Sequence, residues 1–346
     1  MDSLAPDAAF VEIADSPPQP GETRAIAPGV LWLRMPLPFA LNHVNLWLLE
    51  ESDGYTLVDT GYGSDKTRAL WERHFAQAMR GKPVTRIVAT HCHPDHLGNA
   101  AWIAERFDCR VSMTHGEFMS AHAIIDERAA HGPRDTADLF RLHGMAQADI
   151  DALLALGNRY KRGVPAAPPS FDRLLDDDAI TMGGERWRVI LGFGHSSEHA
   201  SLHCADRAVL ISGDMLLPKI STNVSVWPSD PEGDPLGRFL ESLGAYEALP
   251  ESTLVLPSHG LPFRGIAPRI AQLRAHHDER LRELQDAIAG ASAPASASDM
   301  VPVLFRRELD VHQRFFAMGE TIAHLNHLWR HGRVRRLRAA DGSCRF

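Results

Sequence analysis

Short apolar runs alternate with amphipathic stretches along the first third of the chain. The runs are rich in β-branched residues or alternate apolar with polar positions, as strands do. They predict strands at residues 30–35, 44–49, 55–58, 84–90 and 110–113. Helical periodicity between them predicts helices at about 64–80, capped by Ser64, and at about 99–106. Strands that alternate with helices are typical of α/β layers.

The pattern changes at residues 116–165, where helical stretches, including one at 149–160, lie between two strand regions and end in the sequence VPAAPPS. We expect an inserted helical cap there. Strands are predicted again at residues 180–182, 187–190, 200–203, 209–211 and 253–256, with a helix at 235–248. The two halves that flank the insert therefore have a similar layout.

The C-terminal part begins with a long helix predicted at about 267–289, followed by the small-residue linker GASAPASAS at 290–298. Beyond this apparent domain boundary, apolar residues at steps of three and four predict an amphipathic helix at 312–330, and residues 334–346 have the pattern of a β-hairpin. This combination suggests a winged-helix-like unit. The expected organisation is an extended leader at 1–28, a main domain at 29–270, a helix and linker at 271–299, and the small C-terminal domain at 300–346.

Charge limits the partners that we expect. The 346 residues include 36 Lys and Arg against 44 Asp and Glu, a net charge of −8, which opposes the attraction to phosphate that dominates nucleic-acid binding. Residues 301–346 are the exception, because nine Arg against four acidic residues give +5 there and leave −13 for residues 1–300. Only the C-terminal segment is therefore expected to attract phosphate.

Composition also indicates the compartment. Hydrophobic residues at 44% and charged residues at 23% are ordinary for a globular protein. The four cysteines form no C-x-x-C pair and are too few for a disulfide framework. The N-terminal sequence has acidic residues and prolines where a signal peptide would be basic and then apolar, and no run approaches the roughly 18 apolar residues of a membrane span. We expect a cytoplasmic protein without a membrane partner.

Histidines and an aspartate are concentrated directly after the strand predicted at 84–90. The order His91, His93, Asp95, His96 gives the pattern H-x-H-x-D-H, which is much more specific than the general abundance of 19 histidines. Imidazole nitrogen and carboxylate oxygen suit Zn²⁺ and related transition metals, and a loop at a strand end can direct several ligands to one point. Cys92 lies among them, but alternation turns its side chain away, so we expect it to be buried packing.

Three further candidate ligands, His195, Asp214 and His259, each follow a strand-like run. Taken alone, each is more often an ordinary hydrogen-bonded or turn residue. Their repeated placement at strand ends is the reason to group them with the first cluster. His199 and His203 follow His195 in a strand-like alternation and are assigned to the core or to the surroundings of the ligands.

With these residues, and with Leu57-Val58-Asp59-Thr60-Gly61 at a strand end, the chain resembles the metallo-β-lactamase superfamily over residues 30 to about 270. The resemblance implies an αββα sandwich, here with a helical insert and a small winged-helix-like C-terminal domain, and two Zn²⁺ or other divalent transition metal ions such as Fe or Mn at one edge. It implies that one metal is bound by His91, His93 and His195, and the other by Asp95, His96 and His259. Asp214 would bridge the two. An aspartate in place of a cysteine at 214, and the lack of an export signal, argue against a true β-lactamase.

The expected activity is metal-dependent hydrolysis. A bound metal lowers the pKa of water from about 15.7 to about 7, so two cations that share a water make hydroxide available at neutral pH. No serine or cysteine nucleophile is then required, and no phosphate-binding glycine-rich loop is present. Asp95 has a possible catalytic role in proton handling besides its role as a ligand. Asp59 is expected either to accept the second N–H of a ligating imidazole or to be a turn residue.

Substrate recognition is less specified by the sequence. Lys219 and Asn223, in the loop after Asp214, are candidate substrate contacts, although a solvated loop lysine is an equal alternative. The helical insert is expected to roof the site with an apolar wall. We expect a small-molecule substrate with an ester, thioester or lactone bond.

Other functions fit the same fold. The alternative is a ribonuclease or phosphodiesterase, because a winged-helix-like unit and the arginines at 330, 333, 335, 336 and 338 would suit a nucleic acid. The unit would equally serve in packing or in a homodimer, and no aromatic stacking platform accompanies the arginines. An iron protein that handles oxygen or persulfides is disfavoured, since one iron would not need a second ligand set. A binding-only protein would have lost ligands, and none is lost.

Overall fold

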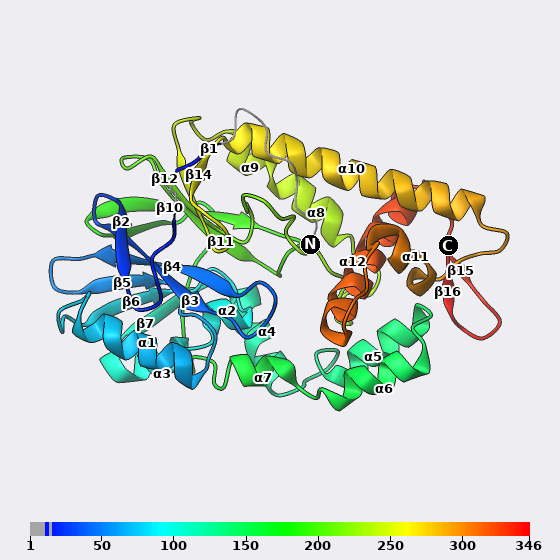
Figure 1. Ribbon diagram of the computed structural model, residues 1–346, viewed down its shortest axis with the longest axis horizontal. Coiled ribbons are helices and arrows are strands. Elements are labelled where there is room, and N and C mark those ends of the chain that lie inside the picture. Colours follow the sequence, from blue (N-terminus) through cyan, green and yellow to red (C-terminus); the bar gives the residue numbers. More distant parts are fainter. Residues whose placement is uncertain (1–10, 14–15) are drawn as a thin grey trace.

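The structure is a computed structural model that describes residues 11–13 and 16–346. Two seven-stranded sheets form the part of the molecule at the left of Figure 1. The first sheet has the order β2-β3-β4-β5-β6-β7-β8. Its strands are β2 Thr23–Ala27, β3 Val30–Pro36, β4 His43–Glu50, β5 Tyr55–Val58, β6 Val84–Val88, β7 Arg110–Met113 and β8 Asp172–Arg173. It is antiparallel from β2 to β5 and parallel from β5 to β8. The three parallel pairs need crossovers, which α1 (Asp65–Ala76), α3 (Ala100–Phe107) and, between β7 and β8, the helical insert provide.

The second sheet has the order β1-β14-β13-β12-β11-β10-β9. Its strands are β1 Val11–Glu12, β9 Ala179–Met182, β10 Glu185–Gly192, β11 His199–Cys204, β12 Val209–Gly213, β13 Leu254–Pro257 and β14 Phe263–Arg264. The pair β12–β13 is parallel, and α8 (Pro235–Ser242) with α9 (Gly244–Glu247) lies in its crossover. The other pairs are antiparallel.

The two sheets bury apolar side chains on both of their faces. Trp32 and Trp47 stack between the sheets with ring centroids 6.1 Å apart, in a cluster that also contains Trp187 of the second sheet. Trp71 of α1 belongs to a second cluster on the outer face of the first sheet, and Phe239 of α8 belongs to a third on the outer face of the second sheet. Because both faces are covered, central strands are buried along their whole length, as in β5, where all four residues are buried. The αββα sandwich expected from the sequence is confirmed.

The segment expected to be an extended leader contributes strands instead. Thr23–Ala27 pairs with β3 as an edge strand, and Val11–Glu12 pairs with β14. Both strands lie at sheet edges. Prolines are tolerated near an edge strand, because their missing N–H groups do not interrupt the hydrogen bonds between central strands. The leader predicted at 1–28 is therefore wrong for these strands, while residues 1–10 and 14–15 lie outside the described residues.

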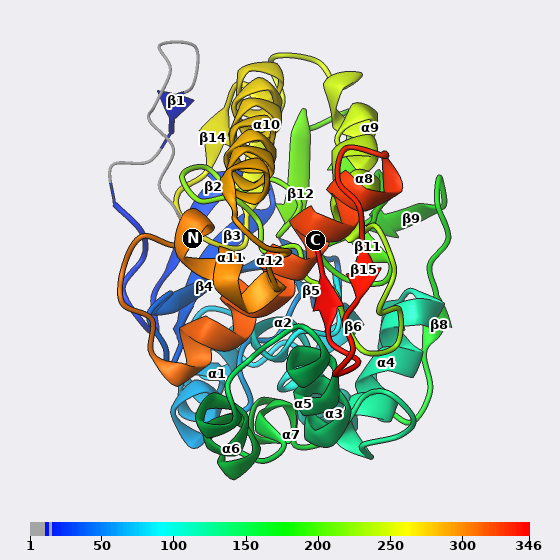
Figure 2. The same cartoon turned by 90° about the vertical axis from the view of Figure 1, so that its right-hand side faces the viewer.

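The insert consists of α4 (His115–Ile125), α5 (Pro133–Leu142), α6 (Gln147–Ala155) and α7 (Arg159–Gly163). The single helix expected at 149–160 is divided in two. Gly157 has a φ of +60°, in the left-handed region that ends helices, and Asn158 then caps α7 by accepting a hydrogen bond from the backbone of Lys161. Figure 2 shows α5, α6 and α7 on one side of the molecule, with α12 between them and α10.

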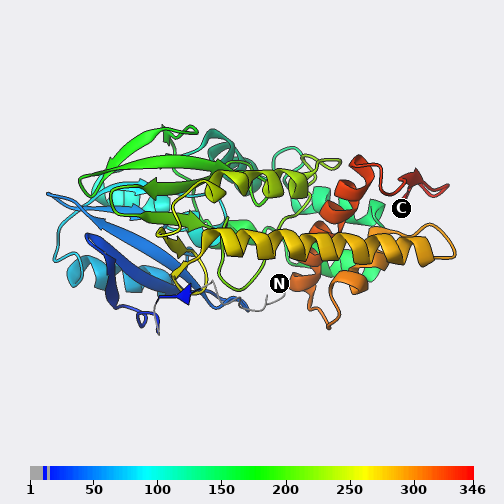
Figure 3. The ribbon, with the colours of Figure 1, turned by 90° about the horizontal axis from the view of Figure 1, so that it is seen from above.

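The C-terminal part consists of α10 (Ile266–Gly290), α11 (Ala297–Leu304), α12 (Val311–Arg330) and a short hairpin of β15 (Leu337–Arg338) and β16 (Cys344–Arg345). Helix α10 runs from the sandwich to the C-terminal helices (Figures 1 and 3). The linker predicted at 290–298 is ordered at its end, because Ser296 caps α11 and the backbone N–H of Phe346 donates to the carbonyl of Ala295 over 2.8 Å. None of the described helices combines the length and apolarity that crossing a membrane requires.

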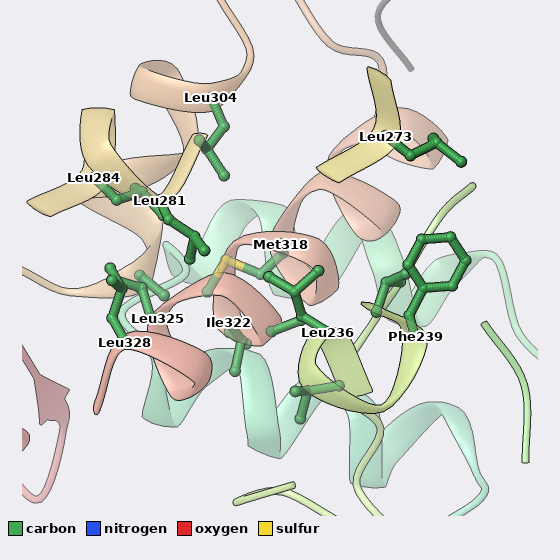
Figure 4. Close-up of a cluster of buried hydrophobic side chains, with 14 of the residues drawn as sticks. Leu236, Phe239, Leu273, Leu281, Leu284, Leu304, Met318, Ile322, Leu325 and Leu328 are labelled. Atoms are coloured by element: carbon green, nitrogen blue, oxygen red, sulfur yellow. The ribbon is translucent and has the colours of Figure 1, made fainter. Parts of the chain in front are cut away.

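Helix α12 confirms the helix predicted at 312–330, but its middle is buried on all sides and not on one face alone. All residues from 317 to 326 are buried. Figure 4 shows Met318 and Ile322 of α12 in the middle of an apolar cluster, between Leu236 of α8 and Leu281 of α10. The insert closes the remaining side, since Phe140 of α5 belongs to the same cluster. The C-terminal helices therefore share one core with the insert and with the outer face of the second sheet.

Candidate metal centre

The seven predicted ligands lie in loops at one edge of the sandwich. His91 and His93 lie between β6 and α2 (Pro94–Leu97), which itself carries Asp95 and His96. The other three ligands follow strands of the second sheet: His195 after β10, Asp214 directly after β12, and His259 two residues after β13. Ends of neighbouring strands meet at the same edge, so residues far apart in sequence converge.

The first group consists of His91, His93, His195 and Asp214. Nε2 of His91 lies 2.9 Å from Nδ1 of His93 and 3.2 Å from Nε2 of His195. Oδ2 of Asp214 lies 3.3 Å from Nε2 of His195. Three ring nitrogens and one carboxylate oxygen therefore surround one point.

The second group consists of Asp95, His96 and His259. Oδ2 of Asp95 lies 3.7 Å from Nε2 of His96 and 3.4 Å from Nε2 of His259. The other oxygen of Asp214, Oδ1, lies 3.6 Å from Nε2 of His96 and 3.5 Å from Nε2 of His259. The two oxygens of Asp214 therefore face different groups, which is the geometry of a bridging ligand.

Three of the imidazole rings are oriented by hydrogen bonds at the nitrogen that points away from the centre, and this arrangement suits the binding of cations. The Nδ1–H of His195 donates to the carbonyl of Asn223, and that of His259 donates to the carbonyl of His43, both over 2.8 Å. The Nδ1–H of His96 donates to Oδ2 of Asp59 over 2.8 Å. Each Nε2 is then left with a lone pair directed inward.

Inward atoms without partners point the same way. Nε2 of His96 and Oδ1 of Asp214 are buried and have no hydrogen-bond partner. Lone pairs that converge in a buried site repel one another unless a cation lies between them. The residues therefore fit two divalent ions, and imidazole with carboxylate is a set that Zn²⁺, Fe²⁺ and Mn²⁺ accept.

Comparison with known proteins identifies the family. Residues 40–259 match the metallo-beta-lactamase superfamily, and residues 281–346 match a metallo-beta-lactamase-like C-terminal domain. The chain belongs to the metallo-β-lactamase superfamily. This family is hydrolytic, which confirms the prediction of a hydrolytic enzyme.

Two of the similar proteins cover most of the chain. A solved structure described as a beta-lactamase domain protein from Burkholderia ambifaria is 49% identical, covers 97% of both chains and superposes with a TM-score of 0.89. The probable metallo-hydrolase YqjP of Bacillus subtilis is 25% identical over 86% of this chain and 91% of its own. The bovine acyl-coenzyme A thioesterase MBLAC2 is 28% identical over 56% of this chain and 65% of its own.

Electrostatics in this superfamily member differ between the two groups. Burial lowers the pKa of His96, but the carboxylates of Asp59, Asp95 and Asp214 outweigh burial and raise it to about 10. Burial holds the pKa values of His91 and His93 well below their ordinary value. The imidazole of His96 therefore holds its proton because carboxylates face it. A bound cation would take the place of this proton.

Asp59 supports the centre from behind. Its Oδ1 accepts from the backbone N–H of Thr90 over 2.7 Å, and its Oδ2 accepts from the hydroxyl of Thr90 and from His96 over 2.8 Å each. Asp59 also has a φ of +62°, which Asp tolerates better than most residues. Of the two interpretations from sequence, the structure has the hydrogen bond to a ligating imidazole. Asp59 acts through His96 and is a positioning residue.

His199 positions the bridging aspartate. Its Nε2 accepts a hydrogen bond of 3.1 Å from the backbone N–H of Asp214. The preceding residue, Gly213, has a φ of +54°, and a Cβ there would lie 2.2 Å from Nε2 of His199. Glycine is therefore required for this contact. The sequence placed His199 near the ligands or in the core, and this hydrogen bond gives it a supporting role.

The structure gives Lys219 and Asn223 other partners than a substrate. Nζ of Lys219 lies 3.0 Å from a carboxylate oxygen of Glu12, and the lysine side chain is 57% exposed. Asn223 is buried, and its side-chain amide donates to Oε2 of Glu320 over 2.9 Å while its amide oxygen accepts from Ser225. Since its carbonyl holds His195, Asn223 supports a ligand.

Glu117 of the insert holds the metal-binding loop, a role that sequence reasoning missed. Its side chain is fully buried, and its two oxygens accept from the backbone N–H groups of Cys92 and Glu198 over 2.8 and 2.7 Å. The hydroxyl of Tyr160 donates to the carbonyl of Cys92 over 2.6 Å. Cys92 itself is buried in the apolar cluster, as expected. No local pattern distinguishes Glu117 from a surface glutamate of a helix.

Proposed function

We propose that the protein hydrolyses an ester, thioester or lactone bond in a small molecule, with two divalent transition metal ions, Zn²⁺ first among them. The bridging geometry of Asp214 carries this proposal, because one carboxylate that faces two ligand groups serves a dinuclear site. The relative named as an acyl-coenzyme A thioesterase supports a thioester within this class.

The residues of the chain divide the work as follows. His91, His93 and His195, with Asp214, would hold one ion, and Asp95, His96 and His259 the other. When bound, the ions would supply a water of lowered pKa and polarise the substrate oxygen. The side chain of Asp95 is 11% exposed and lies at the centre, so its carboxylate can take up a proton from the reacting groups. Asp59 keeps the proton of His96 on Nδ1.

The C-terminal arginines favour a small molecule over a nucleic acid. The guanidinium of Arg336 pairs with a carboxylate oxygen of Glu232 at 2.6 Å and lies over the ring of Trp329. Arg330 donates to the backbone carbonyl of Glu232, and Arg333 donates to Gln285. These arginines have partners within the protein, and the helix before them is enclosed in the core. The unit therefore serves packing in this proposal.

The four cysteines are free thiols, which supports the cytoplasmic location that we expect.

Metal analysis joined to a hydrolysis screen tests the proposal. The purified protein should contain about two metal ions per chain and should hydrolyse aryl esters, acyl-coenzyme A thioesters or lactones, but neither bis(p-nitrophenyl) phosphate nor a short RNA. Removal of the metals with a chelator should abolish the activity, and Zn²⁺ should restore it. Hydrolysis of RNA without any ester or thioester activity would overturn the proposal.

Charge reversal separates the nuclease alternative more sharply than truncation. Cutting the chain near residue 298 would remove α12 from the shared core, so loss of activity would report unfolding. Reversal of the exposed Arg335 and the neighbouring Arg338 to Glu should leave turnover of small substrates and its salt dependence unchanged. A ribonuclease would instead lose affinity and part of its salt dependence.

A further inference from the structure

Arg159, the first residue of α7, is a half-buried cation without an anionic partner. Its Nη2 lies 3.2 Å from Nε2 of His312, which comes from α12. Among the residues that the structure describes, no carboxylate forms an ion pair with Arg159. Asp310 acts on it only at longer range, and its Oδ1 already caps α12 by accepting from Gln313.

The environment makes this isolation costly. Burial lowers the pKa of Arg159, so its charged form has lost part of its hydration. Burial, followed by the charge of Arg159, lowers the pKa of His312 to about 4, so this neighbour is neutral at physiological pH. A partly desolvated guanidinium whose direct partner is neutral would gain from an anion beside it.

Helix α7 contacts the metal-binding loop at Gly163, one helical turn from Arg159. Gly163, one turn further along the helix, lies so close to the loop that a Cβ on it would be 2.6 Å from Cβ of Pro94, between the ligands His93 and Asp95. One helical turn rises about 5.4 Å, which an arginine side chain can span. Tyr62 lies near both the arginines of α7 and the metal-binding loop, because burial raises the pKa of its hydroxyl and the charges of Arg159, Arg162 and Asp95 act on it as well.

Aromatic rings surround the same position. Phe39, in the loop between β3 and β4, lies 6.1 Å from the ring of Tyr62 and 5.9 Å from the ring of His312. Phe316 lies 5.0 Å from His312 and is 36% exposed. Four segments of the chain, namely two loops of the first sheet, the insert and α12, thus bring a cation and apolar rings together, one helical turn from the contact between α7 and the metal-binding loop.

We propose that Arg159 binds an oxyanion of the substrate, a phosphate or a carboxylate, while Phe39, Tyr62 and Phe316 contact its apolar part. This rests on the proposed hydrolysis of a small molecule. It narrows the substrate to esters or thioesters that carry an anionic group several bonds from the bond that breaks. His312 holds the guanidinium in place through a neutral hydrogen-bond acceptor.

Matched substrates test the assignment, because each pair shares its reacting bond and differs in charge. One pair is butyryl-coenzyme A, with its phosphates, and the neutral S-butyryl-N-acetylcysteamine. The other is mono-p-nitrophenyl adipate, with its carboxylate, and p-nitrophenyl hexanoate. R159Q should raise KM for the anionic member of at least one pair about tenfold relative to the neutral member, and R159K should recover part of the loss. The pair that responds identifies the oxyanion.

The matched control is K161Q, which removes one positive charge from an exposed side chain of the same helix. K161Q should leave KM unchanged for both members of both pairs. An equal effect of R159Q on charged and neutral substrates would show that Arg159 only supports the fold and would overturn the proposal. An unchanged KM for both pairs would overturn it as well.

A binding measurement keeps the test independent of turnover. Calorimetry should show that adipate or adenosine 3′,5′-bisphosphate binds about tenfold more weakly to R159Q than to the wild-type protein of equal metal content. Anions held by the metals alone would bind both proteins equally, which contradicts a role of Arg159. If R159Q loses the binding of these anions but the wild-type protein hydrolyses none of the screened substrates, Arg159 is an anion site and the proposed hydrolysis is wrong. Binding of a short RNA through Arg159, with neither small anion bound, would overturn the small-molecule assignment.

Discussion

The amide of Asn223 donates a hydrogen bond of 2.9 Å to the carboxylate of Glu320, and both side chains are buried. Asn223 lies in the loop that follows the bridging ligand, and its carbonyl accepts from the imidazole of His195. Glu320 lies in the middle of α12. The C-terminal helix is therefore connected to a metal ligand through a single residue, so changes in the helix should be measurable at the metal centre.

We expect E320A to weaken metal binding and to lower kcat/KM by about tenfold to a hundredfold, as changes in outer contacts of metal ligands do. The substitution leaves the buried amide of Asn223 without this acceptor. E320Q retains an acceptor oxygen and should recover part of the loss. Competition with a chelator measures the metal affinity. Unchanged metal affinity in a folded E320A variant would contradict the role of this contact.

Replacement of the bridging aspartate should affect both ions. In D214A both groups lose an oxygen ligand, so we expect less than one tightly bound metal per chain and a loss of at least about a thousandfold in turnover. Plasma emission spectroscopy gives the metal content, and circular dichroism checks that the protein is folded. D230N, at an exposed position, is the control and should keep both metals. Two metals and full turnover in D214A would refute the bridging role.

The insert should influence metal binding as well as substrate choice. Glu117 accepts from two backbone N–H groups, one of them in the metal-binding loop. In E117Q one acceptor becomes an NH₂ group that faces a donor, so we expect metal affinity to fall by about tenfold. E127Q, in an exposed position after α4, is the control. Trimming of the whole insert would also remove Glu117 and Tyr160, so we expect it to weaken metal binding as well.

Buried histidines should make the protein less stable in acid. Burial, with a smaller effect of Arg336, lowers the pKa of His143 from its ordinary 6.5 to about 4 in the folded protein. Between pH 6.5 and 4 the unfolded state therefore binds more protons than the folded state. As the pH decreases through this range, the free energy of unfolding decreases, by about 3 kcal/mol once the pH is below 4. Above pH 6.5 this residue has no such effect.

His143 stacks on Phe346 with ring centroids 6.2 Å apart, so H143F retains an aromatic ring but cannot take up a proton. Above pH 6.5, the free energies of unfolding of the two proteins, measured with urea, should depend on pH in the same way. Between pH 6.5 and 4 the free energy of unfolding of H143F should decrease less steeply than that of the wild-type protein. Parallel curves over this range would show that another group is responsible.

The sequence predicted the residues that the structure brings together at the candidate metal centre, because the relevant signal is local. A ligand directly after an apolar run, such as Asp214 after β12, lies at a strand end whatever the rest of the fold does. The residues behind the ligands were missed because their partners are distant: Glu320 is 97 positions from Asn223, and Glu117 is 25 positions from Cys92. A buried carboxylate of this kind has the same local pattern as a solvated one.

The same reasoning explains the differences in the fold. Strand periods located the central strands, but the short edge strands β1 and β2 depend on pairing with β14 and β3 and have little pattern of their own. Helix α12 has polar residues such as Asn326 and His324 that suggest a solvent face. Both are buried, and Asn326 donates to backbone carbonyls of the loop before α8. Polar residues satisfied in this way cannot be distinguished from exposed ones by periodicity.

The enclosure of α12 has a consequence for the order in which the enzyme matures. The ribosome makes this helix after every metal ligand, and until it is made, Glu320 cannot hold the loop that positions His195. The apolar cluster on the outer face of the second sheet also stays incomplete until α12 packs against α8 and α10. The candidate ligands therefore leave the ribosome before this support exists, and the full affinity for metal develops only once α12 has packed.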